Sequence, residues 1–190
     1  SGTQAFQTGD VISIGGMRGS SSVAAQNLTV SATTTLQDYM NFMSGALGIN
    51  TTAGSNGTST VPPPPDPGVS IIPGSTANDI SLQIVGNRGT SNDLSIQPTD
   101  VSVNRAGVIS RPYSFTKVQS ANGESVTTPV TVYDSLGSPV SVNLTAVLVQ
   151  RDDSGTQWQY FVNSPDSTNG DPTGLGLNTS ISMGTLQFAN

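Results

Sequence analysis

Short runs in which apolar and polar residues alternate recur through most of the sequence. Gly-, Pro-, Asn- and Ser-rich segments separate them. Such alternation buries one face of a sheet, because successive side chains of a strand point to opposite sides. With 34% hydrophobic residues the chain can bury a core despite its low charge. We therefore expect a folded, mainly β protein.

One segment has a helical period instead. Leu36, Met40, Met43 and Leu47 follow one another at steps of four, three and four, with Tyr39 on the same side. Thr34 or Thr35 can cap the N-terminus, Asp38 suits the first turn, and Gly48 can end the helix in the left-handed conformation. These signals predict one amphipathic helix.

The strands divide into two groups around a linker. Residues 50–60 are mostly small and polar, and residues 61–68 are rich in proline, so residues 50–68 predict an exposed connection. Before residue 106 we expect strands near 11–14 and 23–30. We also expect a hairpin that joins residues 80–85 to residues 94–96 through the turn at residues 86–89. Short strands then continue through residues 101–118 to the Asn122-Gly123 turn signal.

The clearest β pattern begins at Val126. Residues 126–132 lead through the turn at residues 133–138 into a long strand whose apolar residues share one face: Val140, Val142, Leu144, Ala146 and Leu148. A turn at residues 151–155 then returns the chain into Trp158, Tyr160 and Val162, which face the long strand. After a polar loop over residues 163–178, Ile181, Met183, Leu186 and Phe188 predict a last strand.

These patterns predict two small lobes. Residues 1–106 form a mixed α+β lobe with one helix, and residues 107–190 form an antiparallel β-barrel or sandwich. The last strand meets the chain end without a turn, so we expect this domain to be truncated there. The Ser1-Gly2-Thr3 start likewise suggests a piece cut from a longer chain.

Composition removes several classes of function. The chain has no His and no Cys, which excludes His-dependent triads, thiol nucleophiles, disulfides and the usual zinc sites. The net charge of −6 without a basic cluster argues against nucleic acid, and the apolar runs are too short for a membrane helix. We expect neither partner.

The remaining candidate sites have ordinary explanations. The carboxylate pairs Asp152-Asp153 and Asp166 with Asp171 lie in turns, where Asp bonds the local backbone. Residues 15–20 are rich in glycine but lack the Lys-Ser/Thr ending of a phosphate loop. We therefore predict no enzyme, no catalytic or metal-binding residues and no cofactor. Trp158 and the nearby tyrosines leave open a sugar-stacking platform, although core packing is the stronger reading.

The C-terminal half resembles a known family. Residues 128–140, with their Tyr133-Asp134-Ser135-Leu136-Gly137 turn, are similar to the central β-domain of bacterial flagellar hook proteins. The similarity continues through residues 142–144, residues 152–155, Trp158-Gln159-Tyr160 and residues 184–188, and it spans about residues 111–190. Rod proteins of the same axial family share parts of it. Residues 138–140 depart from the pattern of many members, and the first half resembles the inserted modules of larger hook proteins only loosely.

The resemblance implies a structural, non-enzymatic subunit of the flagellar hook. It would be extracellular, exported by the flagellar secretion system, and polymerised with copies of itself in contact with hook cap and junction proteins. The family's terminal helices, to which polymerisation is attributed, have no counterpart here, so we expect this chain to be a monomer. Residues 50–68 and 163–178 are the expected subunit contacts. A secreted β-rich adhesin or carbohydrate-binding module that uses Trp158 is the alternative.

Overall fold

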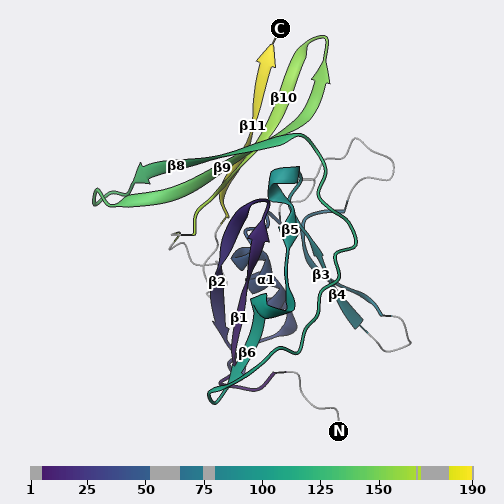
Figure 1. The fold of residues 1–190 in the computed structure, drawn as a ribbon, viewed down its shortest axis with the longest axis vertical. Helices are drawn as coiled ribbons and strands as arrows, with labels where there is room; N and C mark the ends of the chain where they lie inside the picture. Colours follow the sequence, from purple (N-terminus) through teal and green to yellow (C-terminus); the bar gives the residue numbers. More distant parts are fainter. Residues whose placement is uncertain (1–5, 52–64, 75–79, 166, 168–179, 190) are drawn as a thin grey trace.

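The computed structural model describes residues 6–51, 65–74, 80–165, 167 and 180–189. The strands of these residues form three antiparallel sheets, and one α-helix accompanies them (Figure 1). A sheet of five strands and the helix make the first lobe, and a sheet of four strands makes the second. The mainly β class with one helix is confirmed.

The first lobe is built on β1 (Val11–Arg18), β2 (Ser21–Thr29), β6 (Val101–Arg105) and β7 (Val108–Ser110), in the order β2-β1-β6-β7. The short β5 (Leu94–Ser95) pairs with the end of β1. Two 3₁₀ turns flank β5, η1 at Thr90–Asn92 and η2 at Pro98–Asp100. A separate hairpin joins β3 (Gly68–Pro73) to β4 (Ile80–Val85).

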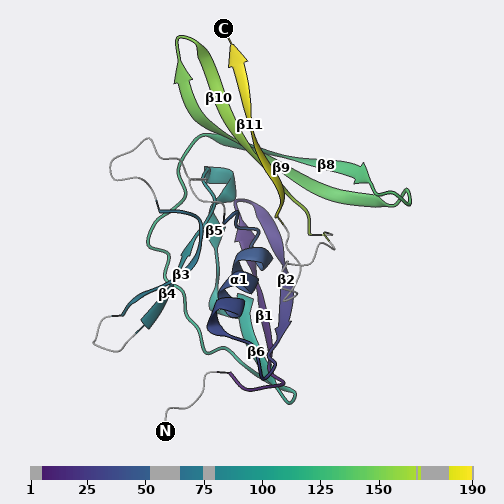
Figure 2. The ribbon, with the colours of Figure 1, turned by 180° about the vertical axis from the view of Figure 1, so that it is seen from behind.

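The helix α1 (Leu36–Ala46) lies across one face of this sheet, as Figure 2 shows from behind. Thr35 caps it and forms a capping box with Asp38, and Gly48 follows with a φ of 62°. The core between helix and sheet is apolar: Ile12, Ile14, Leu28, Val30, Tyr39, Phe42, Met43, Ala46, Leu47, Ile49, Val101 and Val103. The predicted helix and its caps are confirmed, but Leu36 is 41% exposed because it lies at the first turn, outside the core.

Two sequence predictions for residues 80–124 were wrong. Residues 80–85 do not pair with residues 94–96, because β4 pairs with β3 and β5 pairs with β1. Residues 111–124 form no strand, although Tyr113 and Phe115 are partly buried against the first-lobe core. This segment runs back along the first lobe before it enters the second (Figure 1). Aromatic packing, rather than sheet pairing, explains Tyr113 and Phe115, whereas Val118 is 96% exposed.

The second lobe is a sheet of β8 (Ser125–Tyr133), β9 (Pro139–Asp152), β10 (Gly155–Asn163) and β11 (Ser180–Ala189), in the order β11-β10-β9-β8. The predicted hairpins at residues 133–138 and 151–155 and the last strand are confirmed. Over the described residues these strands make an open sheet and not the expected closed barrel or sandwich. β7 still belongs to the first sheet, which therefore reaches Ser110 and passes the predicted boundary at residue 106.

Candidate subunit-contact surfaces

The two faces of the second sheet differ in what covers them. Residues that pair across neighbouring strands share a face, so the register assigns every side chain to one side. We call the face that contains Val147 the inner face, because the first lobe covers part of it. The face that contains Trp158 is the outer face.

The inner face holds the most buried side chains of this sheet. Val147, Phe161, Thr145 and Asn163 are exposed by no more than 3%. The γ-methyl groups of Val147 lie close to Gly89 of the first lobe and to Gly123 of the segment that connects the lobes. The inner face is therefore the docking face of the second lobe.

The outer face carries the alternating apolar residues that the sequence places together. Val126, Val130, Val132, Leu186 and Phe188 are between 42% and 56% exposed on it, whereas Val142 is buried. Periodicity identified this face correctly, but it gave no sign that the opposite face, with Val147 and Phe161, is the better buried one. The first lobe determines which face of the second sheet is covered. Among the described residues, no strand of the first lobe pairs with this sheet, so strand alternation alone does not reveal the covered face.

Trp158 lies on the outer face between Leu148 and Leu186 in register. Its indole N–H donates to Thr156 Oγ1 at 3.2 Å, and Tyr160 is on the same face two residues further along β10. The other tyrosines lie elsewhere: Tyr133 is 71% exposed at the end of β8, and Tyr39 and Tyr113 belong to the first lobe. Of the four tyrosines, only Tyr160 therefore lies beside Trp158.

An aromatic cluster lies in the first lobe and contains Phe6, Tyr39 and Tyr113. The ring of Tyr39 lies 5.2 Å from that of Phe6 and 6.3 Å from that of Tyr113, between centroids. Burial raises the pKa of Tyr113 to about 12 and that of Tyr39 even further. These two phenols remain protonated at neutral pH and serve packing.

Hydrogen bonds join the lobes at the loop before β5. The amides of Gly89 and Thr90 donate to the carbonyls of Asn122 and Gly123 at 2.9 and 3.1 Å, and the amide of Ser91 donates to Ser125 Oγ at 2.8 Å. The composition of residues 86–89 predicts a hairpin turn. In the structure this loop instead holds the start of β8 against the first lobe.

Asp93 strengthens the same junction. Its carboxylate accepts from the amide of Ala121 at 2.7 Å and forms an ion pair with Lys117. Partial burial would raise the pKa of Asp93, but the hydrogen bonds from Lys117 and Ala121 together lower it below its usual value. The segment that connects the lobes is thereby held at several points.

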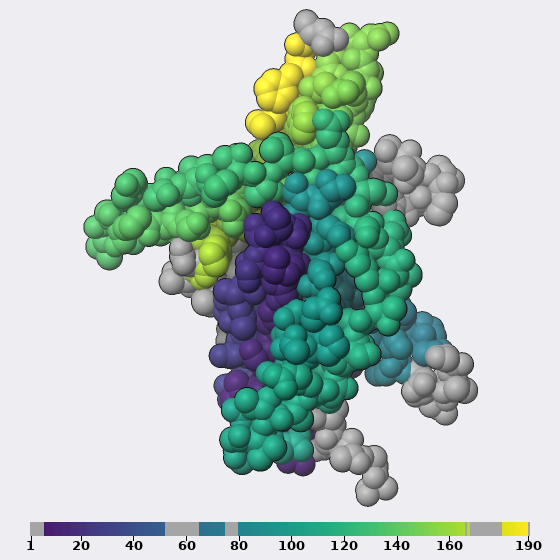
Figure 3. Space-filling view, in the orientation of Figure 1, coloured from purple at the N-terminus to yellow at the C-terminus, as the bar shows by residue number. Residues whose placement is uncertain are grey.

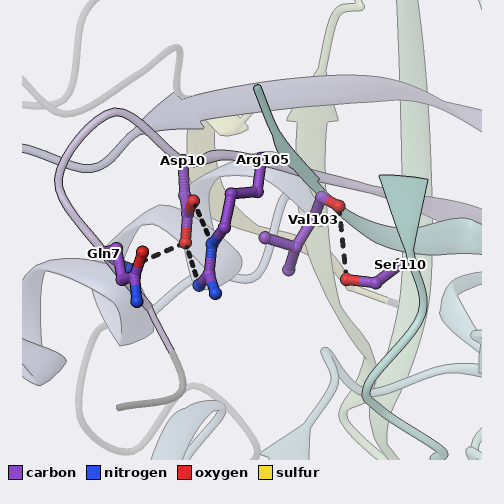
Figure 4. Close-up of polar contacts among 5 residues, drawn as sticks. All are labelled: Gln7, Asp10, Val103, Arg105 and Ser110. Atoms are coloured by element: carbon purple, nitrogen blue, oxygen red, sulfur yellow. Dashed lines mark hydrogen bonds and ion pairs between the residues drawn. The ribbon is translucent and has the colours of Figure 1, made fainter. Parts of the chain in front are cut away.

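A second ion pair joins Arg105 to Asp10 in the first lobe (Figure 4). Arg105 donates to both carboxylate oxygens of buried Asp10, at 2.8 and 2.7 Å, and the amide of Gln7 donates at 2.8 Å. The hydrogen bond from Arg105 lowers the pKa of Asp10 to about 2. This pair ties the start of β1 to the end of β6, and nearby Ser110 Oγ donates to the carbonyl of Val103 at 3.4 Å.

Asp152 and residues 15–20, which the sequence singles out as candidate sites, lie in strands and the turns that join them. Asp152 accepts from the amide of Ser154 and from Gln150 Nε2 at 2.8 and 2.6 Å, and the hydrogen bonds from Ser154 and Gln150 lower its pKa. Asp166 and Asp171 lie outside the described residues. Within the described ranges, no three acidic side chains gather where they could hold a metal ion. Residues 15–20 form the end of β1 and its turn into β2.

The loops expected to contact neighbouring subunits are described only in part. Residues 52–64, 166 and 168–179 lie outside the described residues, so the contact prediction for these loops stays a prediction. No helix among the described residues has the length and apolar character to cross a membrane.

The comparisons with known proteins bear on the second lobe. Residues 102–190 match the family model described as the flagellar basal body protein FlaE D2 domain. The match takes in β6, β7, the connecting segment and the whole second sheet. No curated protein and no solved structure gives a significant match. Residues 102–190 therefore match the FlaE D2 domain family, and this match supports a fragment of a flagellar hook protein with a structural role.

Proposed function

We propose that the full-length protein self-assembles into the flagellar hook and that both lobes described here lie in the outer part of that tube. The family match over residues 102–190 carries this proposal. Other copies of the subunit are the main partners, and hook cap and junction proteins meet the full-length chain. The hook would lie outside the cell, supplied by the flagellar secretion system.

The surface chemistry suits a tube that bends while it transmits torque. Charged residues make up only 9% of the chain, and Ser and Thr together make up about a quarter. Exposed hydroxyl contacts and single surface ion pairs are weak, so neighbouring subunits can exchange them as the tube rotates. These 190 residues contain no Cys, so they cannot themselves form disulfide cross-links to a neighbouring subunit. These properties support a universal-joint role.

Within one subunit the lobes are joined more firmly. Backbone hydrogen bonds from Gly89 and Thr90, together with the Asp93–Lys117 ion pair, hold the connecting segment in place. We infer that bending occurs between subunits rather than between these lobes. The isolated chain is expected to be a monomer, and residues 50–68 and 163–178 are the proposed contact loops.

Polymerisation of the full-length protein tests the proposal. Electron microscopy should show tubes of uniform diameter. A matched variant in which a short Gly/Ser linker replaces residues 11–189 should give thinner tubes, because it lacks the outer lobes. A full-length protein that stays monomeric under all polymerising conditions would contradict self-assembly. An unchanged tube diameter in the variant would contradict the outer position.

A further inference from the structure

A small pocket lies where the two lobes meet. It has a volume of about 50 Å³, and both lobes line it: Arg18 and residues 21–24 from the first lobe and Ser91 beside them, and Thr127, Asn143, Thr145 and residues 163–165 from the second. We call it the junction pocket. In the view of Figure 3 the first lobe and the second sheet meet along this boundary. Its lining is mixed: hydroxyl, amide and guanidinium side chains stand beside the apolar side chains of Val23, Ala24 and Pro165.

Arg18 brings a positive charge to the junction pocket. Its Nη2 donates to the carbonyl of Leu47 at 2.6 Å, near the C-terminus of α1, while its buried Nε has no hydrogen-bond partner. None of the ion pairs between described residues includes Arg18. Desolvation lowers the pKa of Arg18 to about 10, so the guanidinium is still charged at neutral pH. A partly buried cation without a counter-charge is costly.

Asn163, the last residue of β10, faces the same pocket. Only 3% of this residue is exposed, and neither its Oδ1 nor its Nδ2 has a hydrogen-bond partner. Buried amides in proteins are nearly always paired with protein groups or with a bound molecule. The unpaired amide and the unpaired Nε of Arg18 thus both indicate a missing partner.

The size and the donors of the pocket define that partner. A water molecule needs about 10–15 Å³, so a pocket of about 50 Å³ has room for about three to five heavy atoms. A guanidinium N–H and an amide N–H₂ are both donors, and planar carboxylates match arginine well. We propose that the junction pocket binds a small carboxylate anion through Arg18 and Asn163, and that the anion bridges the two lobes.

The carboxylate can come from two sources with the same chemistry. It is either a free small-molecule anion or an Asp or Glu side chain of a second copy of this chain. In either case it binds only when the lobes are docked, so it stabilises the folded chain by mass action. The proposal does not depend on the hook function.

The test is a titration of this chain with sodium acetate, with chloride exchanged for acetate at constant sodium concentration. We expect saturable NMR shifts of the Arg18 Nε–H and Asn163 side-chain amide signals, with a rise in Tm. Arg18→Met should weaken acetate binding by about tenfold or more, and Arg111→Met, which removes an exposed charge, should leave it unchanged. Absence of a saturable shift at these two groups would overturn the proposal.

Asn163→Leu separates a binding role from a packing role and leaves the Arg18–Leu47 hydrogen bond in place. It should keep or raise the Tm in chloride, because it removes an unpaired buried amide, yet abolish the extra stability in acetate. An equal loss of stability in both salts, with acetate binding retained, would overturn the role of Asn163. Shifts that grow with protein concentration in chloride alone would identify a second copy as the source, and shifts that require acetate would identify a free anion.

Discussion

The first lobe packs a helix against its sheet, whereas the second lobe is a single layer of strands that rests on the first lobe. The core of the first lobe comes from α1 and three strands, and Ile14 and Met43 are completely buried in it. In the second lobe, Val147 and Phe161 on the inner face are equally buried, while Val126 and Phe188 on the outer face are more than half exposed. The first lobe therefore makes its own core, and the second depends on its neighbour for cover.

Separation of the lobes should have the largest effect. We expect residues 1–124 to unfold cooperatively on their own, because α1, the first sheet and the packed residues Tyr113 and Phe115 stay together. Residues 125–190 alone should give no cooperative transition, since a single sheet with both faces in water lacks a core. Circular dichroism during heating measures both pieces. A cooperative transition of residues 125–190 at the Tm of the whole chain would contradict the dependence of the second lobe on the first lobe for its core.

Truncation of the inner face should come next. Phe161→Ala removes a ring that is 1% exposed and should lower the free energy of unfolding by about 3–5 kcal/mol. The matched control is Phe188→Ala on the outer face, where the ring is 56% exposed and the loss should be about 1 kcal/mol or less. Urea unfolding measures both. Equal losses would show that the two faces do not differ in burial.

The contact between the lobes should be sensitive to one methyl group. Gly89 has a φ of 99°, and an added Cβ would lie 2.6 Å from Cγ2 of Val147, so Gly89→Ala should cost about 1–3 kcal/mol. Gly107→Ala is the control, because Gly107 also has a positive φ but no atom within 4 Å of the added Cβ. Urea unfolding should show a larger loss for Gly89→Ala. A loss no greater than that of the control would mean that the lobes do not touch at Gly89.

The smallest expected effect is a pH dependence within the first lobe. The pKa of Asp10 is about 2, below its ordinary value of 3.8, so ionised Asp10 stabilises the fold fully above pH 4. This contribution is lost as the pH falls from about 4 to 2. Asp10→Asn should lower the Tm at pH 7, and its difference from the wild type should shrink toward pH 2. A difference that stays constant between pH 7 and pH 2 would contradict the role of the Asp10–Arg105 pair.

Sequence reasoning succeeded where the signal was local. The cap at Thr35, the left-handed Gly48 and the turn at Asp134, whose carboxylate accepts from the amides of Leu136 and Ser138, all depend on residues close in sequence. It failed where distant segments decide the structure. The Gly86–Gly89 segment has the composition of a hairpin turn, but long-range bonds to Asn122 and Gly123 use its backbone instead.

Distant segments also decide which of the candidate surfaces is buried. Alternation assigned Leu144 and Trp158 to one face of the sheet, but the first lobe decides that the opposite face, with Phe161, is better buried. The junction pocket was equally hidden, because Arg18 and Asn163 are far apart in sequence and neither belongs to a motif.

Immunogold electron microscopy with antibodies raised against this chain tests the central claim most directly. On intact cells that carry flagella, the gold particles should decorate the short curved segment between the cell surface and the long filament. Cells in which the gene for the protein is deleted provide the control and should show no label. Label spread over the cell surface, or absent from the curved segment, would contradict the assignment of this chain to the outer part of the hook.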